Sequence, residues 1–233
     1  LCIARACAEH GAELAFSYQG EALKKRVDPL AASLGSDFVT ECDVADEASL
    51  DALFETLDAR WGGLDFAVHA IGFSDKNELR GRYVDTSRAN FSMSMDISVY
   101  SFTAVAQRAA TLMPKGGSLL TLTYYGAEKV MPHYNVMGVA KAALETSVKY
   151  LANDLGPKNI RVNAIAPGAT KTTALQKVLT PEMEKAMLAR TPLKRLGEPQ
   201  DMANAALFLC SPAAGWISGQ ILTVSGGGVQ ELH

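Results

Sequence analysis

The sequence lacks the features of several large classes of protein. Its 233 residues carry 22 lysines and arginines against 25 aspartates and glutamates, a net charge of −3. It therefore lacks the basic excess with which nucleic-acid binders neutralise phosphates. Its longest apolar runs, such as 160–165, have the length of a strand, so we expect no membrane span. No secretory signal is visible, and we expect a cytoplasmic protein.

Paired cysteines are missing as well. The four cysteines are scattered along the chain, without the spacing of a zinc site or the density of a disulfide-stapled domain. No carboxylate or cysteine stands at ligand spacing from His69 or His133, and we expect no metal site.

What the chain does contain is an alternation of strands and helices. Strands are predicted at 13–18, 38–42, 64–70, 118–122, 160–165 and 220–224, and helices at 1–10, 20–34, 46–61, 86–113, 134–155, 181–190 and 199–210. Such alternation indicates βαβ units and a parallel sheet with helices on both faces. With no repeat or linker in view, we predict one α/β domain over 1–233, a Rossmann-like doubly wound sheet.

The most informative local pattern is a tyrosine and a lysine seven residues apart, Tyr134 and Lys141. In a helix over 134–155, seven residues at about 100° each return to nearly the same face, which predicts one stripe with a separation of about 10 Å along the axis. The ammonium would lower the tyrosine pKa and hold a cofactor hydroxyl, while the phenol would hydrogen-bond a substrate oxygen that becomes negative. On spacing alone, a helix-start tyrosine and a solvated lysine is the commoner explanation.

Three strand ends favour the reductase interpretation, because ligands of open parallel sheets bind beyond the carboxyl ends of the strands. One strand runs into Thr123 and Tyr124, a hydroxyl and a second phenol. Another leads to Gly72, where a missing side chain suits the close approach of a flat ligand. A third runs into Asp43, whose carboxylate could accept a hydrogen bond from an adenine amine. We expect these ends to meet one face of the 134–155 helix.

Several blocks within residues 1–163 resemble the NADH-dependent enoyl-acyl-carrier-protein reductases, a branch of the short-chain dehydrogenase/reductase superfamily. The blocks are 12–19, 42–44, 69–73, 96–102, 120–127 and 134–141. Ordinary members use Tyr-x3-Lys, and the position four before Lys141 is here Met137. The longer spacing suits hydride delivery to C3 of a trans-2-enoyl thioester while charge develops on the thioester oxygen.

The resemblance implies reduction of the C2–C3 double bond of trans-2-enoyl-acyl-carrier-protein thioesters with NADH, in fatty-acid synthesis, by a homotetramer. Tyr134 would hydrogen-bond the enolate oxygen, Lys141 would hold the nicotinamide ribose, and Tyr124 would line the acyl pocket. The residues implied at the cofactor are Gln19, Asp43, Val44, Gly72, Thr123, Lys141, Thr170 and Thr172. The residues that follow the strand at 13–18 include no carboxylate placed to exclude NADPH.

Residues 164–233 resemble a different branch. The order Pro-Gly-x-x-x-Thr at 167–172 is that of ordinary short-chain dehydrogenases, and 196–202 and 220–232 resemble a bacterial 7α-hydroxysteroid dehydrogenase. We therefore expect a hybrid chain with altered acyl recognition. An NAD(P)-dependent alcohol or ketone oxidoreductase, which Met137 opposes, and a non-catalytic relative of the fold stay open as alternatives.

The resemblance also implies that one element is missing. The chain opens inside a helix that Gly11 ends. The family's first strand and its glycine-rich turn, which binds the pyrophosphate at a helix N-terminus, would precede this helix. The glycines at 226–228 follow a strand but open no helix. We expect strand edges left unpaired beside the missing strand, and weaker cofactor binding.

Overall fold

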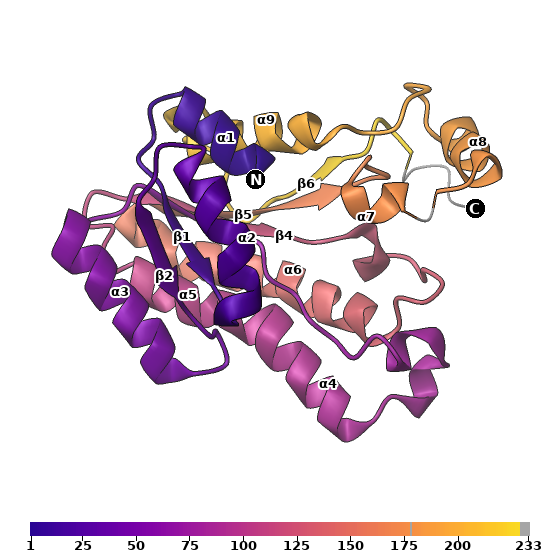
Figure 1. Ribbon diagram of the computed structural model, residues 1–233, viewed down its shortest axis with the longest axis horizontal. Helices are drawn as coiled ribbons and strands as arrows, with labels where there is room; N and C mark the ends of the chain where they lie inside the picture. The colour runs from indigo at the N-terminus through magenta and orange to yellow at the C-terminus, as the bar shows by residue number, and fades with distance from the viewer. Residues whose placement is uncertain (178, 229–233) are drawn as a thin grey trace.

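The computed structural model describes residues 1–177 and 179–228 and has the predicted Rossmann-like α/β fold (Figure 1). All its strand pairs are parallel. A two-stranded sheet pairs β1 (Ala15–Tyr18) with β2 (Phe38–Glu41). A four-stranded sheet has the order β3 (Phe66–His69), β4 (Gly117–Leu122), β5 (Ile160–Pro167) and β6 (Ile221–Val224).

The two sheets are not joined by strand pairing. Within the described part of the chain, β1 pairs only with β2 and β3 only with β4, so each has one unpaired edge. This agrees with the expectation of unpaired edges. The divided sheet puts the ends of β1 and β2 in one group and the ends of β3, β4 and β5 in another.

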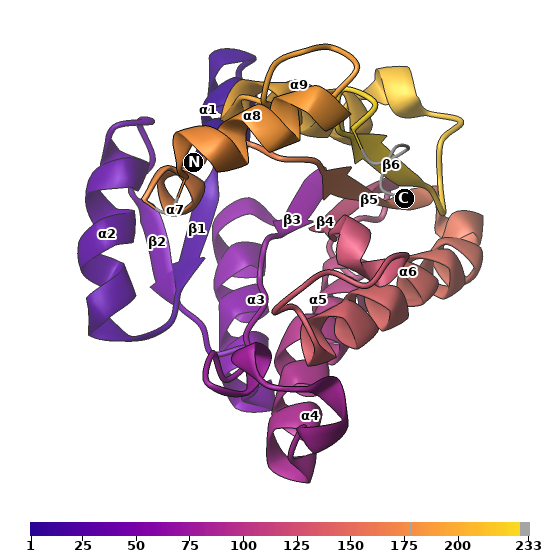
Figure 2. The same ribbon diagram turned by 90° about the vertical axis from the view of Figure 1, so that its right-hand side faces the viewer.

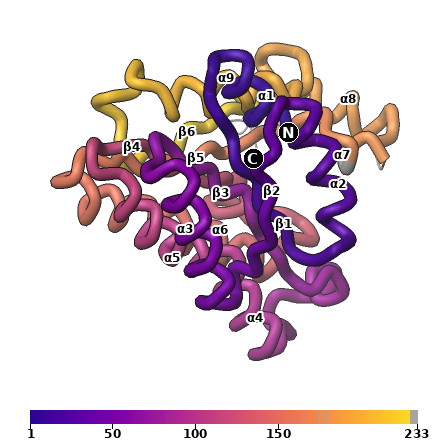
Figure 3. The backbone as a smooth tube through the Cα atoms, turned by 60° about the vertical axis from the view of Figure 1, so that its left-hand side comes forward, coloured from indigo at the N-terminus to yellow at the C-terminus, as the bar shows by residue number. Residues whose placement is uncertain are grey.

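Helices cover both faces of the four-stranded sheet (Figure 2). One face carries α1 (Cys2–Glu9) and α9 (Pro199–Cys210), which pack on each other. The opposite face carries α5 (Ser101–Ala109) and α6 (Val136–Leu155). In the smaller sheet, α2 (Gly20–Ala32) packs on both strands, as the tube view shows (Figure 3).

The core alternates along β4 as two-sided burial requires. Leu119 belongs to the cluster beneath α5 and α6 with Phe102 and Leu144, whereas the next residue, Leu120, belongs to the cluster beneath α9 with Leu209. All five side chains are almost fully buried. This packing fixes where the carboxyl end of β4 lies, and Thr123 and Tyr124 follow that end directly.

The helix predicted over 86–113 is confirmed over 88–109, where it consists of three contiguous helical segments. They are α4 (Arg88–Met95), a π-helical turn η3 (Asp96–Tyr100) and α5. Buried serine hydroxyls bond main-chain groups here: that of Ser98 bonds the amide and carbonyl of Phe73, and that of Ser101 donates to the Ile97 carbonyl. Such side-chain bonds compete with helical hydrogen bonds, and π-turns are frequent at functional sites.

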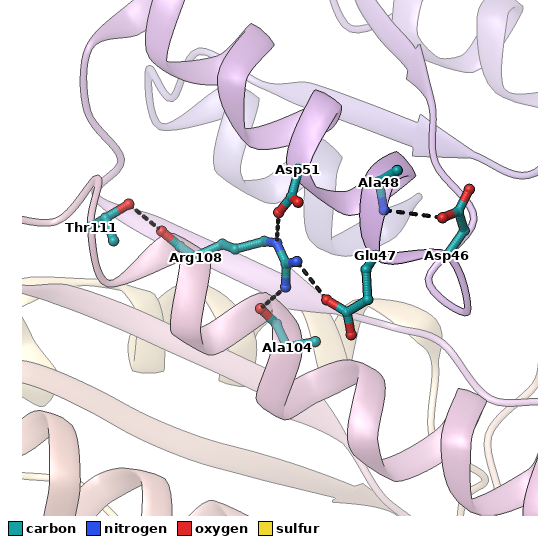
Figure 4. Close-up of polar contacts among 7 residues, drawn as sticks. All are labelled: Asp46, Glu47, Ala48, Asp51, Ala104, Arg108 and Thr111. Carbon is teal, nitrogen blue, oxygen red and sulfur yellow. Dashed lines mark hydrogen bonds and ion pairs between the residues drawn. The ribbon is translucent and has the colours of Figure 1, made fainter.

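An ion-pair cluster ties α5 to α3 (Glu47–Trp61) (Figure 4). Asp46 caps α3 by accepting from the Ala48 amide. Arg108 of α5 donates to Asp51 at 2.7 Å and to Glu47 at 2.6 Å.

Two short helices follow β5, namely α7 (Thr173–Gln176) and α8 (Pro181–Arg190), and they lie beyond its carboxyl end (Figure 1). Of the helices described, none combines the length and the apolar character that a bilayer crossing demands.

Candidate functional site

Lys141 lies buried where the ends of β3 and β4 meet α6. Its Nζ donates to the carbonyl of Leu122, the last residue of β4, at 2.8 Å. A Cβ built on Gly72 would lie 3.7 Å from that Nζ and 3.8 Å from the Ser98 hydroxyl. The structure thus brings Lys141 and Gly72 together, as the sequence predicts, and adds Ser98, which sequence reasoning missed.

Tyr134 does not lie on the helix that carries Lys141. The helix begins at Val136, and the turn before it holds His133 and Asn135 at φ values of 60° and 39°. The Asn135 amide donates to three carbonyls of the 78–81 loop, the shortest at 2.7 Å. The prediction of a helical stripe is wrong, because these bonds hold the backbone in a left-handed turn.

Two glycines form the slot in which the Tyr134 ring lies. A Cβ built on Gly126 would lie 2.4 Å from Tyr134 Cδ1, and one built on Gly138 would lie 2.8 Å from the Gly126 carbonyl oxygen. The Tyr134 ring meets the Tyr124 ring edge to face, with centroids 5.0 Å apart. The structure therefore brings the two predicted phenols together.

Burial keeps the Tyr134 phenol protonated. It raises the pKa of Tyr134, and the neighbouring Tyr124 raises it further. Burial raises the pKa of Tyr124 as well. The predicted lowering of the Tyr134 pKa by Lys141 is not found, because burial and Tyr124 both raise this pKa. Both phenols are therefore neutral hydrogen-bond donors.

Lys141 and its neighbours have strongly shifted pKa values. Burial lowers the pKa of Lys141 to about 8, against the opposing charge of Glu145. Thr123 donates from its hydroxyl to Glu145 at 2.7 Å. Burial, followed by the Lys141 charge, lowers the pKa of His69 to about 3. The His69 ring lies within hydrogen-bond distance of the Thr121 and Ser101 hydroxyls, so it is a neutral, fixed group at the end of β3.

The residues predicted at adenine lie apart from this cluster, after the ends of β1 and β2. Gln19 donates to the Asp43 carboxylate at 2.8 Å, so two predicted cofactor residues touch each other. Glu41 accepts from the Gly20 amide at 3.2 Å. Val44 packs against the small core cluster that contains Leu50.

A cavity of about 560 Å³ opens beside Tyr124, whereas Tyr134 is not among its lining residues. Tyr124, Thr170 and Thr172 are the predicted residues among its lining. Thr170 is buried and donates to the Gly168 carbonyl, while Thr172 caps α7. Sequence reasoning expected an acyl pocket at Tyr124 but missed much of the lining. Its further lining includes Met131, Met183, Met187 and Arg190.

The sequence did carry a signal for this lining. Met183 and Met187 stand four apart on α8 and so share one face of that helix. Methionines are interpreted by default as core filler, because the thioether side chain fills irregular gaps. In this structure the same adaptable side chains line a predominantly apolar cavity.

The site geometry agrees with a comparison against known families. Residues 1–228 match the family model described as Enoyl-(Acyl carrier protein) reductase. The chain belongs to this family. The family assignment confirms the resemblance of residues 1–163 and extends it through most of the remaining chain.

Individual relatives of this enoyl reductase are similar along almost all of its length. The Enoyl-[acyl-carrier-protein] reductase [NADH] 1 of Rhizobium meliloti (strain 1021) is 57% identical over 226 residues, 97% of this chain and 83% of the relative. The NADH enoyl reductase FabI of Rickettsia typhi (strain ATCC VR-144 / Wilmington) is 52% identical, over 94% of this chain and 84% of its own. A crystal structure of the Anaplasma phagocytophilum reductase in complex with NAD superposes with a TM-score of 0.91 and 52% identity, covering 97% and 85% of the two chains.

The expected change of family after residue 163 finds no support in these comparisons. The family match runs to residue 228 without a break in the range it covers, and relatives of the same reductase cover 97% of the chain. The order Pro-Gly-x-x-x-Thr at 167–172 is a short motif at the end of β5. A motif of this length separates the branches of one superfamily poorly.

Proposed function

We propose that this protein reduces the C2–C3 double bond of trans-2-enoyl thioesters of an acyl carrier protein, with NADH, as part of fatty-acid synthesis. The observation that carries the proposal is the pair of neutral phenols, Tyr124 and Tyr134, with ring centroids 5.0 Å apart, of which Tyr124 lines an apolar cavity. Lys141 is buried at the end of β4, the strand that Tyr124 follows. Donors held in place before reaction stabilise an oxygen that gains charge, because they need no reorganisation.

The residues of the site divide the chemistry between them. Tyr134 donates its phenol hydrogen to the thioester oxygen as that oxygen gains enolate charge, and its raised pKa keeps that hydrogen in place. Tyr124 orients the Tyr134 ring and bounds the cavity that takes the acyl chain. Met183 and Met187 adapt the wall to that chain.

The residues present fit a nicotinamide cofactor. Gly72 leaves open space beside Lys141 Nζ, since a Cβ there would already be in van der Waals contact with the lysine. Lys141 would hold the ribose hydroxyls. Thr170 and Thr172 would bond the carboxamide, and Thr123 would stand beside them. At the other end of the cofactor, Asp43 and Val44, with Gln19, would hold adenine. When bound, the cofactor supplies the hydride. Met137 occupies the position of the usual tyrosine and offers no competing phenol.

NADH is the proposed cofactor because relatives more than half identical to this chain carry NADH in their names. Glu41, whose carboxylate accepts from the Gly20 amide next to Gln19, places negative charge beside this end of the sheet. That charge disfavours the 2′-phosphate of NADPH. Initial rates with the two cofactors test the choice: a preference for NADH supports it, and equal or higher activity with NADPH contradicts it.

A homotetramer in the cytoplasm completes the proposal. Large apolar side chains are exposed on α4, η3 and α6, namely Phe91, Tyr100, Val139 and Tyr150. A face of this kind is typical of a subunit interface. Light scattering on the purified protein distinguishes a tetramer, which supports the proposal, from a monomer, which contradicts it.

A comparison of substrates separates this activity from that of an ordinary ketone reductase of the same superfamily. Met137, at the position of the ordinary tyrosine, opposes the ketone reductase. NADH oxidation with crotonyl thioester, compared with a ketosteroid, decides between the two. We expect turnover of the thioester and none of the ketosteroid; the reverse would overturn the ranking.

A further inference from the structure

Glu145 is a partly buried carboxylate that the mechanism above does not use. It stands four residues after Lys141, one helical turn further along α6. The two side chains bond successive residues at the end of β4: Lys141 Nζ donates to the Leu122 carbonyl at 2.8 Å, and Glu145 accepts from the Thr123 hydroxyl at 2.7 Å. Two consecutive turns of α6 thus hold the end of one strand.

Besides holding the end of β4, this arrangement affects the charge of Lys141. Burial lowers the pKa of Lys141 to about 8, and the negative charge of Glu145 raises it again. His69 faces Lys141 from β3 as a neutral ring, because burial and Lys141 lower its pKa to about 3. The other groups facing Lys141, the Leu122 carbonyl, Thr123 and Ser98, do not ionise at neutral pH.

Burial and the Thr123 hydrogen bond act in opposite directions on the Glu145 carboxyl group. Burial raises the pKa of its carboxyl, while the Thr123 hydrogen bond lowers it. Outside the site, Glu128 raises the same pKa and Lys149 lowers it. Glu128 is exposed at the surface, where solvent screens its charge. Glu145 bonds Thr123 and stands one helical turn from Lys141, and these two features distinguish it from Glu128.

We propose that Glu145 is a positioning residue that keeps Lys141 in its ammonium form and fixes the Thr123 hydroxyl beside it. The role rests on the proposed function, in which Lys141 holds the cofactor ribose as a hydrogen-bond donor. A neutral amine would offer one donor fewer and no charge, so loss of Glu145 weakens cofactor binding before it alters the phenols.

The test follows the charge of Lys141 directly, without cofactor. The Lys141 Cε resonance in the ligand-free protein, assigned by its absence in Lys141→Arg, is followed by carbon NMR against pH. Glu145→Gln keeps the shape of the side chain and an acceptor for Thr123 but removes the charge. We expect the midpoint of the Lys141 titration in this variant to fall by about one pH unit. At a pH above the midpoint, this shift lowers the ratio of ammonium to neutral amine roughly tenfold.

Two matched variants separate charge from structure. Glu128→Gln removes the exposed carboxylate that faces Glu145, and its midpoint stays near that of the wild type. Glu145→Asp keeps the charge and restores the midpoint at least in part. An unmoved midpoint in folded Glu145→Gln, or an equal shift in Glu128→Gln, overturns the proposal. So does a fall in Glu145→Asp as large as in Glu145→Gln.

The kinetic counterpart is the dependence of kcat/KM on pH. The alkaline limb set by Lys141 moves to lower pH in Glu145→Gln, with a rise in the KM for NADH that exceeds the fall in kcat. A wild-type protein inactive on enoyl thioesters would refute the proposed function while leaving the NMR result intact, so the two failures are distinguishable.

Discussion

At the scale of single residues, Gly126 and Gly138 decide where the Tyr134 ring lies. Neither glycine could carry a larger side chain without a clash. A Cβ built on Gly126 would lie 2.4 Å from Tyr134 Cδ1, and a Cβ built on Gly138 would lie 2.8 Å from the Gly126 carbonyl oxygen. The ring is therefore held by close packing and by Tyr124, and the Asn135 side chain holds the turn beside it.

Gly126→Ala tests this slot. The added methyl group must displace the Tyr134 ring, and a shift of about 1 Å in a reacting group costs on the order of 10²-fold in rate. We expect that loss in kcat on an enoyl thioester, with the fold retained by circular dichroism. Gly156→Ala is the matched control, because its Cβ would meet nothing within 4 Å at a negative φ. Equal kcat values in the two variants would show that the slot does not position Tyr134.

At this scale the sequence predicted residue types better than their geometry. Tyr124, Lys141 and Gly72 lie at the ends of β4 and β3, because their places follow from predicted strands, and Tyr134 packs on Tyr124. The turn at Asn135 was not predictable from helical spacing, since its partners are carbonyls of the distant 78–81 loop. The pKa of Tyr134 depends on burial, and burial is a property of the folded site.

At the scale of elements, Arg108 fixes α5 against the first turn of α3. Its guanidinium is 15% exposed and bonds Glu47 and Asp51 (Figure 4). Each acidic partner is 60% exposed, which limits the energy of the pairs through solvent screening. Arg108→Met keeps the aliphatic stem, and we expect a loss of about 1 kcal/mol in the free energy of unfolding.

Urea unfolding measures this loss. The control is Arg82→Met, because Arg82 pairs with Asp85 at 78% exposure on the surface, and we expect its unfolding midpoint to match the wild type. A midpoint of Arg108→Met that also matches the wild type would mean that apolar packing alone aligns α3 and α5.

Helices and strands could be predicted from the sequence where their apolar residues are regularly spaced, as in β4 and α9. The π-turn within the helix that follows residue 86 was not predictable, because the Ser98 hydroxyl in it bonds Phe73, which only the folded sheet brings close.

At the scale of the whole molecule, buried His69 makes stability depend on pH. Its folded pKa of about 3 lies below the ordinary value of 6.5. Between these values the unfolded chain binds a proton that the folded chain does not, so acid favours unfolding. We expect the free energy of unfolding to fall by about 1.4 kcal/mol per pH unit as the pH drops below 6.5 through this residue.

His69→Gln, which can still bond the Thr121 and Ser101 hydroxyls, makes this slope shallower. Urea titrations at several acidic pH values measure it, with the exposed His10 replaced in the same way as control. If His69→Gln and the wild type lose stability in parallel, the pH dependence comes from other groups.

The central claim is that a neutral Tyr134 phenol stabilises the enolate oxygen during reduction of an enoyl thioester. Tyr134→Phe removes only the hydroxyl, and its most direct test is kcat with NADH and crotonyl thioester at fixed pH. We expect a fall of about 10²-fold or more, the scale of one lost oxyanion donor, with little change in the KM for NADH. An unchanged kcat in the folded variant would contradict it.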